Sequence, residues 1–393
     1  MTYRGQQKTK VRGLKNRLGF YIGILLAITV AGAVSLQAQI KAPYPPSLVI
    51  QSAKWGFNHL IRLAHTAGHG GSDLWPVTWG ADGNIYTSFG DGGGFSGASD
   101  GRGRVSIGFA RILGFPPHVK GVDLWGAAPK YAKHPATFCG KAGTMLSVNG
   151  VLYTWVASWY NDEKDDFVRC PPNPKTPQDR LAWSRDLGAT WTLSRWKLEE
   201  TPGQMKLAGQ FLNYGRNNNG ARDQYVYQYT IVANDPKATY LIRVLPQDLQ
   251  KDPRTSGEYE YYAGPGPKWT ADHSKARPVF VDPNGRQIMH VVYDRGLRLY
   301  IACAQGYGVG AMGLFDAPEP WGPWTTIAYY NNWGHFGRRE ALGVDFPTKW
   351  ISLDGKTLWA VFSGGRLKPT DDMLDGFNLV KLTLTLREKQ KRR

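Results

Sequence analysis

A tight turn followed by a strand-like stretch and a closing aromatic residue recurs five times in this chain of 393 residues. Three of the copies contain Asp-Gly or Asn-Gly, which supply the positive φ angles that tight hairpin turns need. The closing aromatic residues are 67, 74, 73 and 59 residues apart. Repetition at a long and fairly regular period indicates radial repetition, and it predicts an all-β fold, a five-bladed β-propeller. The copies begin at Asp82, Asn149, Asp223, Asp294 and Asp354, and they end at Tyr86, Tyr153, Tyr227, Tyr300 and Trp359.

We expect one β-propeller over residues 60–386, because each blade needs its neighbours to bury its two faces. Residues 39–59 contain a proline-rich stretch and are expected to form a linker and entry segment. Residues 377–386 alternate in polarity like a strand, and they could pair with an N-terminal strand to close the ring. Residues 387–393 form a basic tail.

The first 38 residues are expected to form a signal peptide or a signal anchor. Residues 1–17 carry six basic side chains and no acidic one, and no residue from Leu18 to Leu36 is charged. This order is typical of export signals, and the uncharged stretch is long enough to span a bilayer. Because basic residues stay on the cytoplasmic side, we expect the body to be exported, either periplasmic or extracellular. If the leader is not cleaved after Ala38, residues 18–36 would anchor the protein in the membrane.

The net charge of +17 is concentrated at the two ends of the chain. The leader contributes +6 and the tail contributes +4, which leaves +7 for the body, without a dense basic block. We therefore expect no nucleic-acid partner. We also expect no cofactor, although the axis of a propeller could hold a structural calcium ion. Three cysteines remain, of which Cys139 and Cys170 could pair in an oxidising compartment, whereas their spacing predicts no zinc site.

A carboxylate and two indoles lie close together in the sequence at the first expected strand of the first blade. Asp73 precedes this strand, and Trp75 and Trp79 lie within it. Carboxylates perform acid–base chemistry on glycosidic bonds, and indole faces stack on sugar rings. A turn aspartate and two core tryptophans would give the same pattern, so the sequence leaves both interpretations open.

Four more residues are candidates for the same site. Asp91 lies in a glycine-rich loop, whose backbone can approach a ligand closely. Asp223 stands at the start of a strand in the third blade, where it could act as a third acid. His290 and Lys349 are expected to donate hydrogen bonds to sugar hydroxyls.

The segments 72–95, 184–191, 313–324 and 346–386 resemble exported bacterial proteins of a five-bladed β-propeller family whose relatives include endo-D-arabinanases. Residues 317–324, Ala-Pro-Glu-Pro-Trp-Gly-Pro-Trp, are also similar to segments of five-bladed arabinanases and β-xylosidases. Residues 184–191 fit the Asp-box pattern of sialidase-like propellers, in which Asp186 would have a structural role.

The resemblance implies that catalytic carboxylates project from inner strands towards the propeller axis, and the matching positions are Asp73, Asp91 and Asp223. It also implies a glycoside hydrolase that acts on a furanoside-containing polysaccharide or oligosaccharide. Two alternatives remain open at this point. One is a carbohydrate-binding module without catalysis, and the other is an interaction scaffold attached to a membrane by the N-terminal helix.

Overall fold

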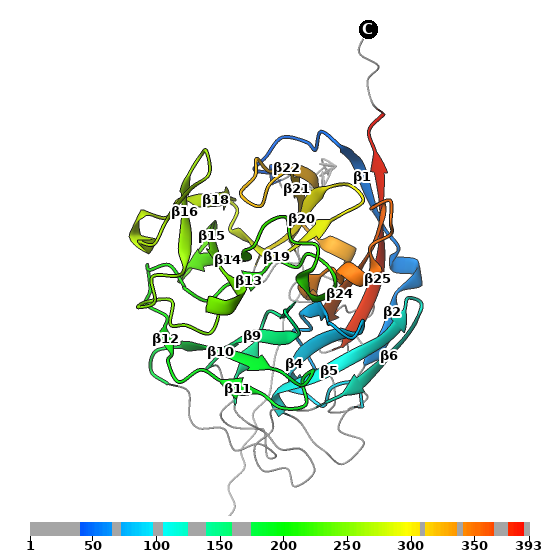
Figure 1. Cartoon of the computed structure of the whole chain (residues 1–393). Coiled ribbons are helices and arrows are strands. Elements are labelled where there is room, and N and C mark those ends of the chain that lie inside the picture. Colours follow the sequence, from blue (N-terminus) through cyan, green and yellow to red (C-terminus); the bar gives the residue numbers. More distant parts are fainter. Residues whose placement is uncertain are drawn as a thin grey trace, which may run out of the picture. The chain divides into compact units, whose positions relative to one another are not determined.

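The computed structural model describes residues 40–64, 72–96, 105–124, 139–158, 174–306, 311–335, 341–364 and 376–388. These residues belong to one compact body that starts at Ile40, whereas the expected leader lies outside the described residues. Five antiparallel sheets are arranged around a central axis, as the sequence predicts for a five-bladed propeller (Figure 1). Within the described ranges, no helix is both long and apolar enough to cross a membrane.

The first blade is a four-stranded sheet in sequence order, from the innermost strand to the outermost. Its strands are β3 (Val77–Trp79), β4 (Ile85–Gly92), β5 (Val105–Phe115) and β6 (His118–Asp123).

In the second blade, two short strands share the inner position beside β9, and two more pair with β10 outside it. Its strands are β7 (Lys141–Ala142), β8 (Leu146–Val148), β9 (Val151–Ala157), β10 (Gln178–Ser184), β11 (Thr192–Leu193) and β12 (Leu198–Glu199).

The third blade has a short inner strand and extra outer strands, because both β16 and β18 pair with β15. Its strands are β13 (Gln210–Phe211), β14 (Val226–Val232), β15 (Asp235–Val244), β16 (Glu260–Gly264), β17 (Lys268–Thr270) and β18 (Pro278–Val281).

The fourth and fifth blades complete the ring. The fourth contains β19 (Arg286–Asp294), β20 (Leu299–Gly306), β21 (Met312–Ala317) and β22 (Thr325–Tyr330). The fifth contains β23 (Ala341–Asp345), β24 (Thr357–Gly364) and β25 (Phe377–Leu386), with β1 (Ile50–Trp55) and β2 (Ile61–Ala64) on its outside. Short 3-10 helices connect several strands: η1 (Phe57–His59), η3 (Arg216–Asn218), η4 (Pro246–Asp248), η5 (His273–Lys275), η6 (Trp333–His335) and η7 (Thr348–Trp350).

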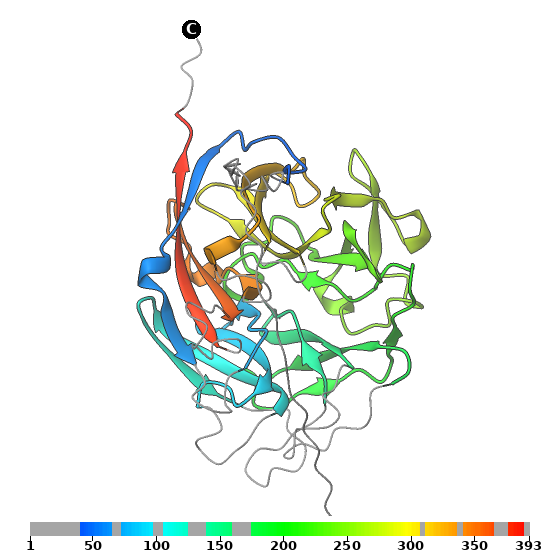
Figure 2. The same cartoon turned by 180° about the vertical axis from the view of Figure 1, so that it is seen from behind.

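The ring is closed by pairing between the two ends of the body. Strand β1 runs antiparallel to β25, with Trp55 opposite Leu382 and Ile50 opposite Leu386, and the two strands lie side by side in both views (Figures 1 and 2). The expected closing strand is therefore confirmed. The first strand of the ring nevertheless begins at Ile50, inside the segment 39–59 that we expected to be a linker and entry segment. These residues form a strand because they pair with the edge of β25, which would otherwise be exposed.

Each apolar cluster among the described residues lies between two neighbouring blades. One cluster, for example, packs Val292 and Ile301 of the fourth blade against Leu358 and Leu382 of the fifth. Four other clusters fill the remaining blade interfaces in the same way. Because every interface carries its own apolar core, the five blades stabilise one another as a single unit.

The five recurring turns occupy equivalent places. Each one joins the innermost strand of a blade to its second strand, so the closing aromatic residues lie on β4, β9, β14, β20 and β24. The Asp box is also structural, as expected. Asp186 accepts hydrogen bonds from Ser184 Oγ at 2.7 Å and from the Thr190 amide at 2.9 Å. Trp191 stacks on Phe109 of the neighbouring blade, with 3.9 Å between the ring centroids.

Only part of the expected cysteine pairing can be located. Cys139 is disulfide-bonded, and Cys303 is a free thiol buried on β20. Cys170 lies outside the described residues.

The closure of the ring makes a prediction about truncation. A chain that starts at Ile40 keeps every sheet and should unfold cooperatively, whereas a chain that starts at Asp73 lacks β1 and β2 and exposes the edge of β25. We expect the shorter chain to aggregate or to lose its cooperative transition in urea. Equal unfolding midpoints for the two chains would show that β1 is not needed to close the ring.

Candidate functional site

The inner strands have two ends with different structures, which we call the turn end and the entry end. At the turn end, the recurring turns join the first and second strands of each blade. Arg216 on η3 donates to the Ala81 carbonyl, and Asn217 accepts a hydrogen bond from the Gly150 amide at 2.9 Å, so three of these turns are in contact. The other two turns touch where Gly296 approaches Gly355. The opposite end, where the inner strands begin, is called the entry end.

Asp73 lies at the entry end of the first blade. Its backbone forms an antiparallel bridge with Gly90, with N–O distances of 3.0 and 2.9 Å. Gly90 is five residues along β4 from Ile85, which places it about 17 Å from the turn. A Cβ atom on Gly90 would be 3.2 Å from Asp73 Oδ1 and 3.6 Å from Lys141 Cδ. The carboxylate and the lysine stem therefore pack on the same glycine, and a side chain at this position would push against the carboxylate.

Asp91 directly follows Gly90 on β4, so its backbone belongs to the same end of the blade as Asp73. The side chain of Asp91 lies outside the described part of the structure. The prediction that these two carboxylates act together stays a prediction.

Asp223 does not join this group, and its expected role as a third acid needs correction. It lies at the turn end, where Tyr227 Oη donates to Asp223 Oδ2 at 2.6 Å and the Tyr225 amide donates to Oδ1 at 2.9 Å. Asp82 makes the same contacts in the first blade, with Tyr86 Oη at 2.8 Å. Asp223 therefore caps a turn, about one strand length away from Asp73.

The two tryptophans are core residues. Trp75 is fully buried, donates to the Ser72 carbonyl at 2.8 Å, and packs against Phe89 and Phe377. It cannot offer a face to a sugar without unfolding the blade. Trp79 ends β3 on the side of the turn and packs partly buried against the cluster between the first and fifth blades. Of the two interpretations that the sequence left open, the structure therefore favours core packing for both Trp75 and Trp79.

His290 connects blades instead of facing a ligand. It is buried on β19, and its Nδ1 lies 3.4 Å from Asp345 Oδ2 on β23. The same Asp345 oxygen accepts a hydrogen bond from the Val77 amide at 2.9 Å, so the pair joins three blades. Burial lowers the pKa of His290, and the negative charge of Asp345 opposes that shift only in part. The imidazole is therefore neutral near pH 7.

Lys349 lies at the turn end as well. Its ammonium group sits over the ring of Phe115, 4.7 Å from the centroid, and burial lowers its pKa while Asp82 opposes the shift. It is therefore placed at the opposite end of the inner strands from Asp73, and the two cannot hold one small ligand. Lys349 lies on the 3-10 helix η7, which connects two strands. The spacing of residues in the sequence does not tell whether such a connection lies at the turn end or at the entry end.

The entry end also carries polar residues that the sequence analysis did not select. A cleft of about 130 Å³ lies between the second and third blades, and its lining includes Lys141, Asp179, Lys206 and Gln210. A second cleft of about 130 Å³ lies on the other side of the segment 206–210, where Gln287 contributes to the lining. The Oε1 atom of Gln210 is buried and has no hydrogen-bond partner among the described residues.

Asp179 has the most perturbed environment in this cleft. Lys206 Nζ lies 3.6 Å from Asp179 Oδ2 and 2.5 Å from Glu200 Oε1. Burial raises the pKa of Asp179 to about 7, because the attraction of Lys206 offsets only part of the desolvation and Glu200 adds repulsion. The signal for this residue was present in the sequence: Asp179 shares with Leu181 the buried side of β10, where a charge is unexpected.

The described residues contain no group of three or more His, Cys, Asp or Glu side chains that could hold a metal ion. A calcium ion, which the axis of a propeller could hold, would therefore find no such group of side chains within these ranges.

Comparisons with known proteins place the chain in a family. A family model described as a domain of unknown function, DUF4185, matches residues 140–360, which is more than half of the chain, and the chain belongs to this family. No curated protein matches the sequence.

Several solved structures are similar in outline. A protein of unknown function from Dyadobacter fermentans is 8% identical with a TM-score of 0.46, over 86% of this chain and 100% of that one. A GH43_1 enzyme from Xanthomonas citri is 10% identical with a TM-score of 0.45, over 84% and 93%. Zg3597, a family 117 glycoside hydrolase from the marine bacterium Zobellia galactanivorans, is 10% identical with a TM-score of 0.45, over 85% and 90%. At this level of similarity, the reaction has to be argued from the residues of this chain.

The environment of Asp179 predicts a pH-dependent effect of its replacement. Because the pKa of Asp179 is raised on folding, the folded state binds a proton that the unfolded state releases between about pH 4 and 7, and stability is lost as the pH rises through this window. Asp179→Asn cannot ionise and should escape this loss. The free energy of unfolding of Asp179→Asn minus that of the wild type should therefore be about 2 kcal/mol larger at pH 8 than at pH 5, which means that the variant is relatively more stable at pH 8.

Urea unfolding at the two pH values would measure this difference. Glu199→Gln, which removes an exposed carboxylate one strand away, is the matched control for the change in net charge. If the wild type and Asp179→Asn differed by the same amount at both pH values, the carboxyl group would not hold a proton in the folded state.

Proposed function

We propose that this member of the DUF4185 family is an exported, carbohydrate-active propeller that hydrolyses glycosidic bonds at its entry end. The observation that carries the proposal is the packing of Asp73 and Lys141 on Gly90, at the end where the inner strands begin. This position combines a carboxylate and a hydrogen-bond donor next to the propeller axis. The resemblance to five-bladed arabinanases favours a furanoside-containing polysaccharide as the substrate.

Hydrolysis of a glycosidic bond needs two carboxyl groups in different protonation states. One donates its proton to the leaving oxygen, and the other is ionised and either attacks the anomeric carbon or activates a water molecule. We propose Asp73 and Asp91 for these roles, since their backbones lie together on the first blade. Lys141 and Gln210 line the cleft at the entry end and would bind sugar hydroxyls there. They would take the role that the sequence analysis assigned to Lys349 and His290.

A comparison of two aspartates tests this site. Asp73→Asn should lower hydrolysis of an arabinofuranoside polymer by about 10²-fold or more, because the substitution removes an acid–base group and keeps the shape of the side chain. Asp223→Asn makes the same chemical change at the turn end and should keep activity within about twofold of wild type, with at most about 1 kcal/mol lost from the turn. Release of reducing ends would measure activity, and circular dichroism would check the fold.

Equal losses in both variants would contradict the assignment of the entry end, and so would full activity of Asp73→Asn. A wild-type protein that binds the polymer but cleaves no glycan in a broad screen would instead support the carbohydrate-binding module.

We also propose that the body is exported through its basic and apolar N-terminal segment. In cells with an intact cytoplasmic membrane and a permeabilised outer envelope, added protease should digest the body while a cytoplasmic marker stays intact. Replacing Arg12, Lys15 and Arg17 with Glu should reduce this digestion, because the charge bias that sets the orientation would be lost. Complete protection of the wild-type body until lysis would contradict export.

A further inference from the structure

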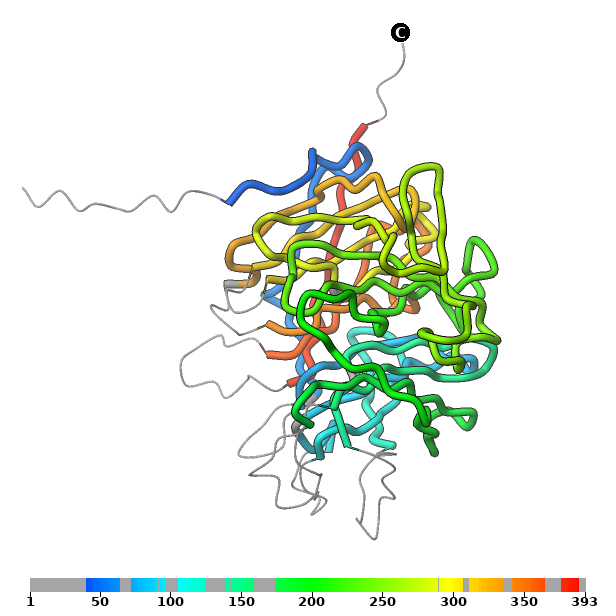
Figure 3. The backbone as a smooth tube through the Cα atoms, turned by 90° about the vertical axis from the view of Figure 1, so that its left-hand side faces the viewer, coloured from blue at the N-terminus to red at the C-terminus, as the bar shows by residue number. Residues whose placement is uncertain are grey.

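The segment that enters the propeller and the end of its last strand lie side by side. Ser47 Oγ donates to Asp316 Oδ2 at 2.7 Å, which fixes the entering segment to the fourth blade. Arg387 then donates to the same segment twice, from its amide to the Val49 carbonyl at 2.8 Å and from Nε to the Ser47 carbonyl at 2.7 Å. The entering segment around Ser47 therefore lies against the end of β25, and in Figure 3 the blue segment reaches the red end of this strand at the top of the body.

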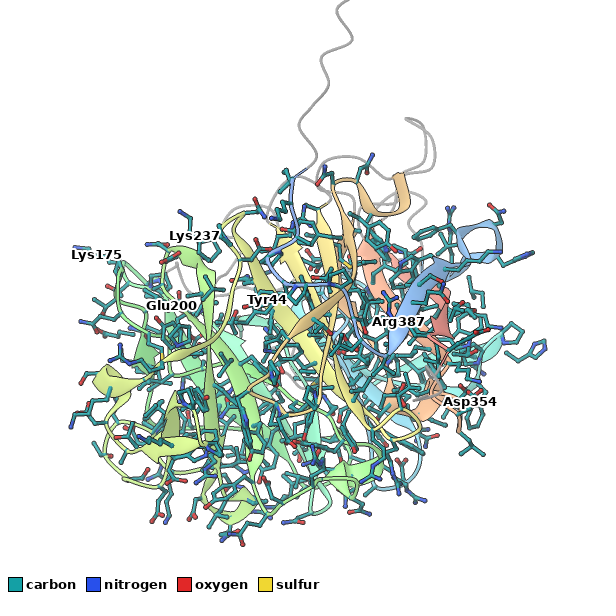
Figure 4. All side chains as sticks on the ribbon, turned by 90° about the horizontal axis from the view of Figure 1, so that it is seen from above. Tyr44, Lys175, Glu200, Lys237, Asp354 and Arg387 are labelled. Atoms are coloured by element: carbon teal, nitrogen blue, oxygen red, sulfur yellow. The ribbon has the colours of Figure 1, made fainter. Side chains whose placement is uncertain are left out.

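Residues 45–49, 51 and 386–388 together line an open cleft of about 980 Å³. We call these residues the docking patch. Figure 4 looks onto the side of the body where Tyr44 and Arg387 lie. The cleft lies at the margin of the fourth and fifth blades, far along the chain from the residues of the entry end.

The docking patch exposes apolar side chains, and its two charged residues, Arg387 and Glu388, balance each other. Leu48 is 82% exposed and Val49 is 39% exposed, although the backbone around them is held by the hydrogen bonds of Ser47. Beyond Arg387, the sequence continues with one acidic residue and four basic ones, Lys389, Lys391, Arg392 and Arg393. An exposed leucine on a body whose sequence continues into a basic segment has the two features that bind peripheral proteins to anionic lipid surfaces, an apolar side chain and positive charge.

The position of the patch in the chain also favours a membrane. Eleven residues separate Leu48 from Leu36, the last residue of the uncharged N-terminal stretch. Fully extended, this connection reaches about 40 Å. If the leader is retained and residues 18–36 span the bilayer, Leu48 is confined to within that distance of the lipid surface.

We infer that the docking patch binds the surface of a bilayer that contains anionic phospholipid. Leu48 and Val49 insert at the level of the headgroups, while the basic residues that follow Arg387 attract the lipid phosphates. This contact would orient the propeller on the membrane and would hold it there even after the leader is cleaved. The inference rests on the proposed export of the body, and it does not depend on the hydrolytic reaction.

Vesicle binding of the body alone tests the inference. The ring closes within residues 50–386 and contains every described sheet, so a chain that starts at Ile40 keeps the complete fold. It should co-sediment at least tenfold better with vesicles of 30% phosphatidylglycerol in phosphatidylcholine than with phosphatidylcholine alone. Binding should fall at least tenfold between 50 and 500 mM salt, because the attraction is screened.

Two variants and a matched control locate the contact. Leu48→Ser should weaken binding several-fold, and replacing Lys389, Lys391, Arg392 and Arg393 with Gln should weaken it at least tenfold. Leu353→Ser makes the same change at a fully exposed leucine in the turn between β23 and β24, and it should have no effect. Equal binding to neutral vesicles, equal effects of the two leucine variants, or no binding to either vesicle would overturn the inference. Hydrolysis of the glycan polymer should be unchanged in all three variants, so the proposed reaction and the docking patch fail independently.

Discussion

Pairing of β1 with β25 is the constraint on which the rest of the structure depends, because it turns five separate sheets into a closed ring. A blade on its own exposes two apolar faces, and the five clusters among the described residues are all formed between neighbours. In the closed ring, the inner strands of all five blades run in the same direction along the axis. The inner strands therefore have two structurally different ends, one made of short turns and one where the strands begin.

The turn end could be predicted from the sequence because its interactions are local. Tight turns with an aromatic residue a few positions later identified all five blades, and three of these turns contain Asp-Gly or Asn-Gly. The Asp box identified a sixth turn that holds Trp191 against the neighbouring blade. The same local chemistry explains the main error. Asp82 and Asp223 make identical contacts with the tyrosine four residues later, so the repeat itself marked Asp223 as a turn residue.

The entry end could not be predicted to the same extent, because its residues come together only when the blades pack. Asp73 was selected from its neighbours Trp75 and Trp79, yet both indoles turn into the core while Lys141, from the next blade, packs beside the carboxylate across Gly90. The cleft residues Asp179, Lys206 and Gln210 come from two blades, Asp179 from β10 of the second and the other two from the segment 206–210 that enters the third. Of these three residues, only Asp179 could have been recognised from the sequence, because it is a charged residue on the buried side of a strand.

The central claim is that the protein meets its ligand at the entry end, and hydrogen exchange of backbone amides tests this claim without relying on catalysis. Exchange would be followed by mass spectrometry with and without a saturating arabinofuranosyl oligosaccharide. Peptides that cover Gly90, Lys141 and Gln210 should exchange more slowly in the presence of the sugar, whereas peptides that cover Asp82 and Asp223 should be unchanged. Slower exchange at the turns of Asp82 and Asp223, with no change around Gly90, would contradict the account.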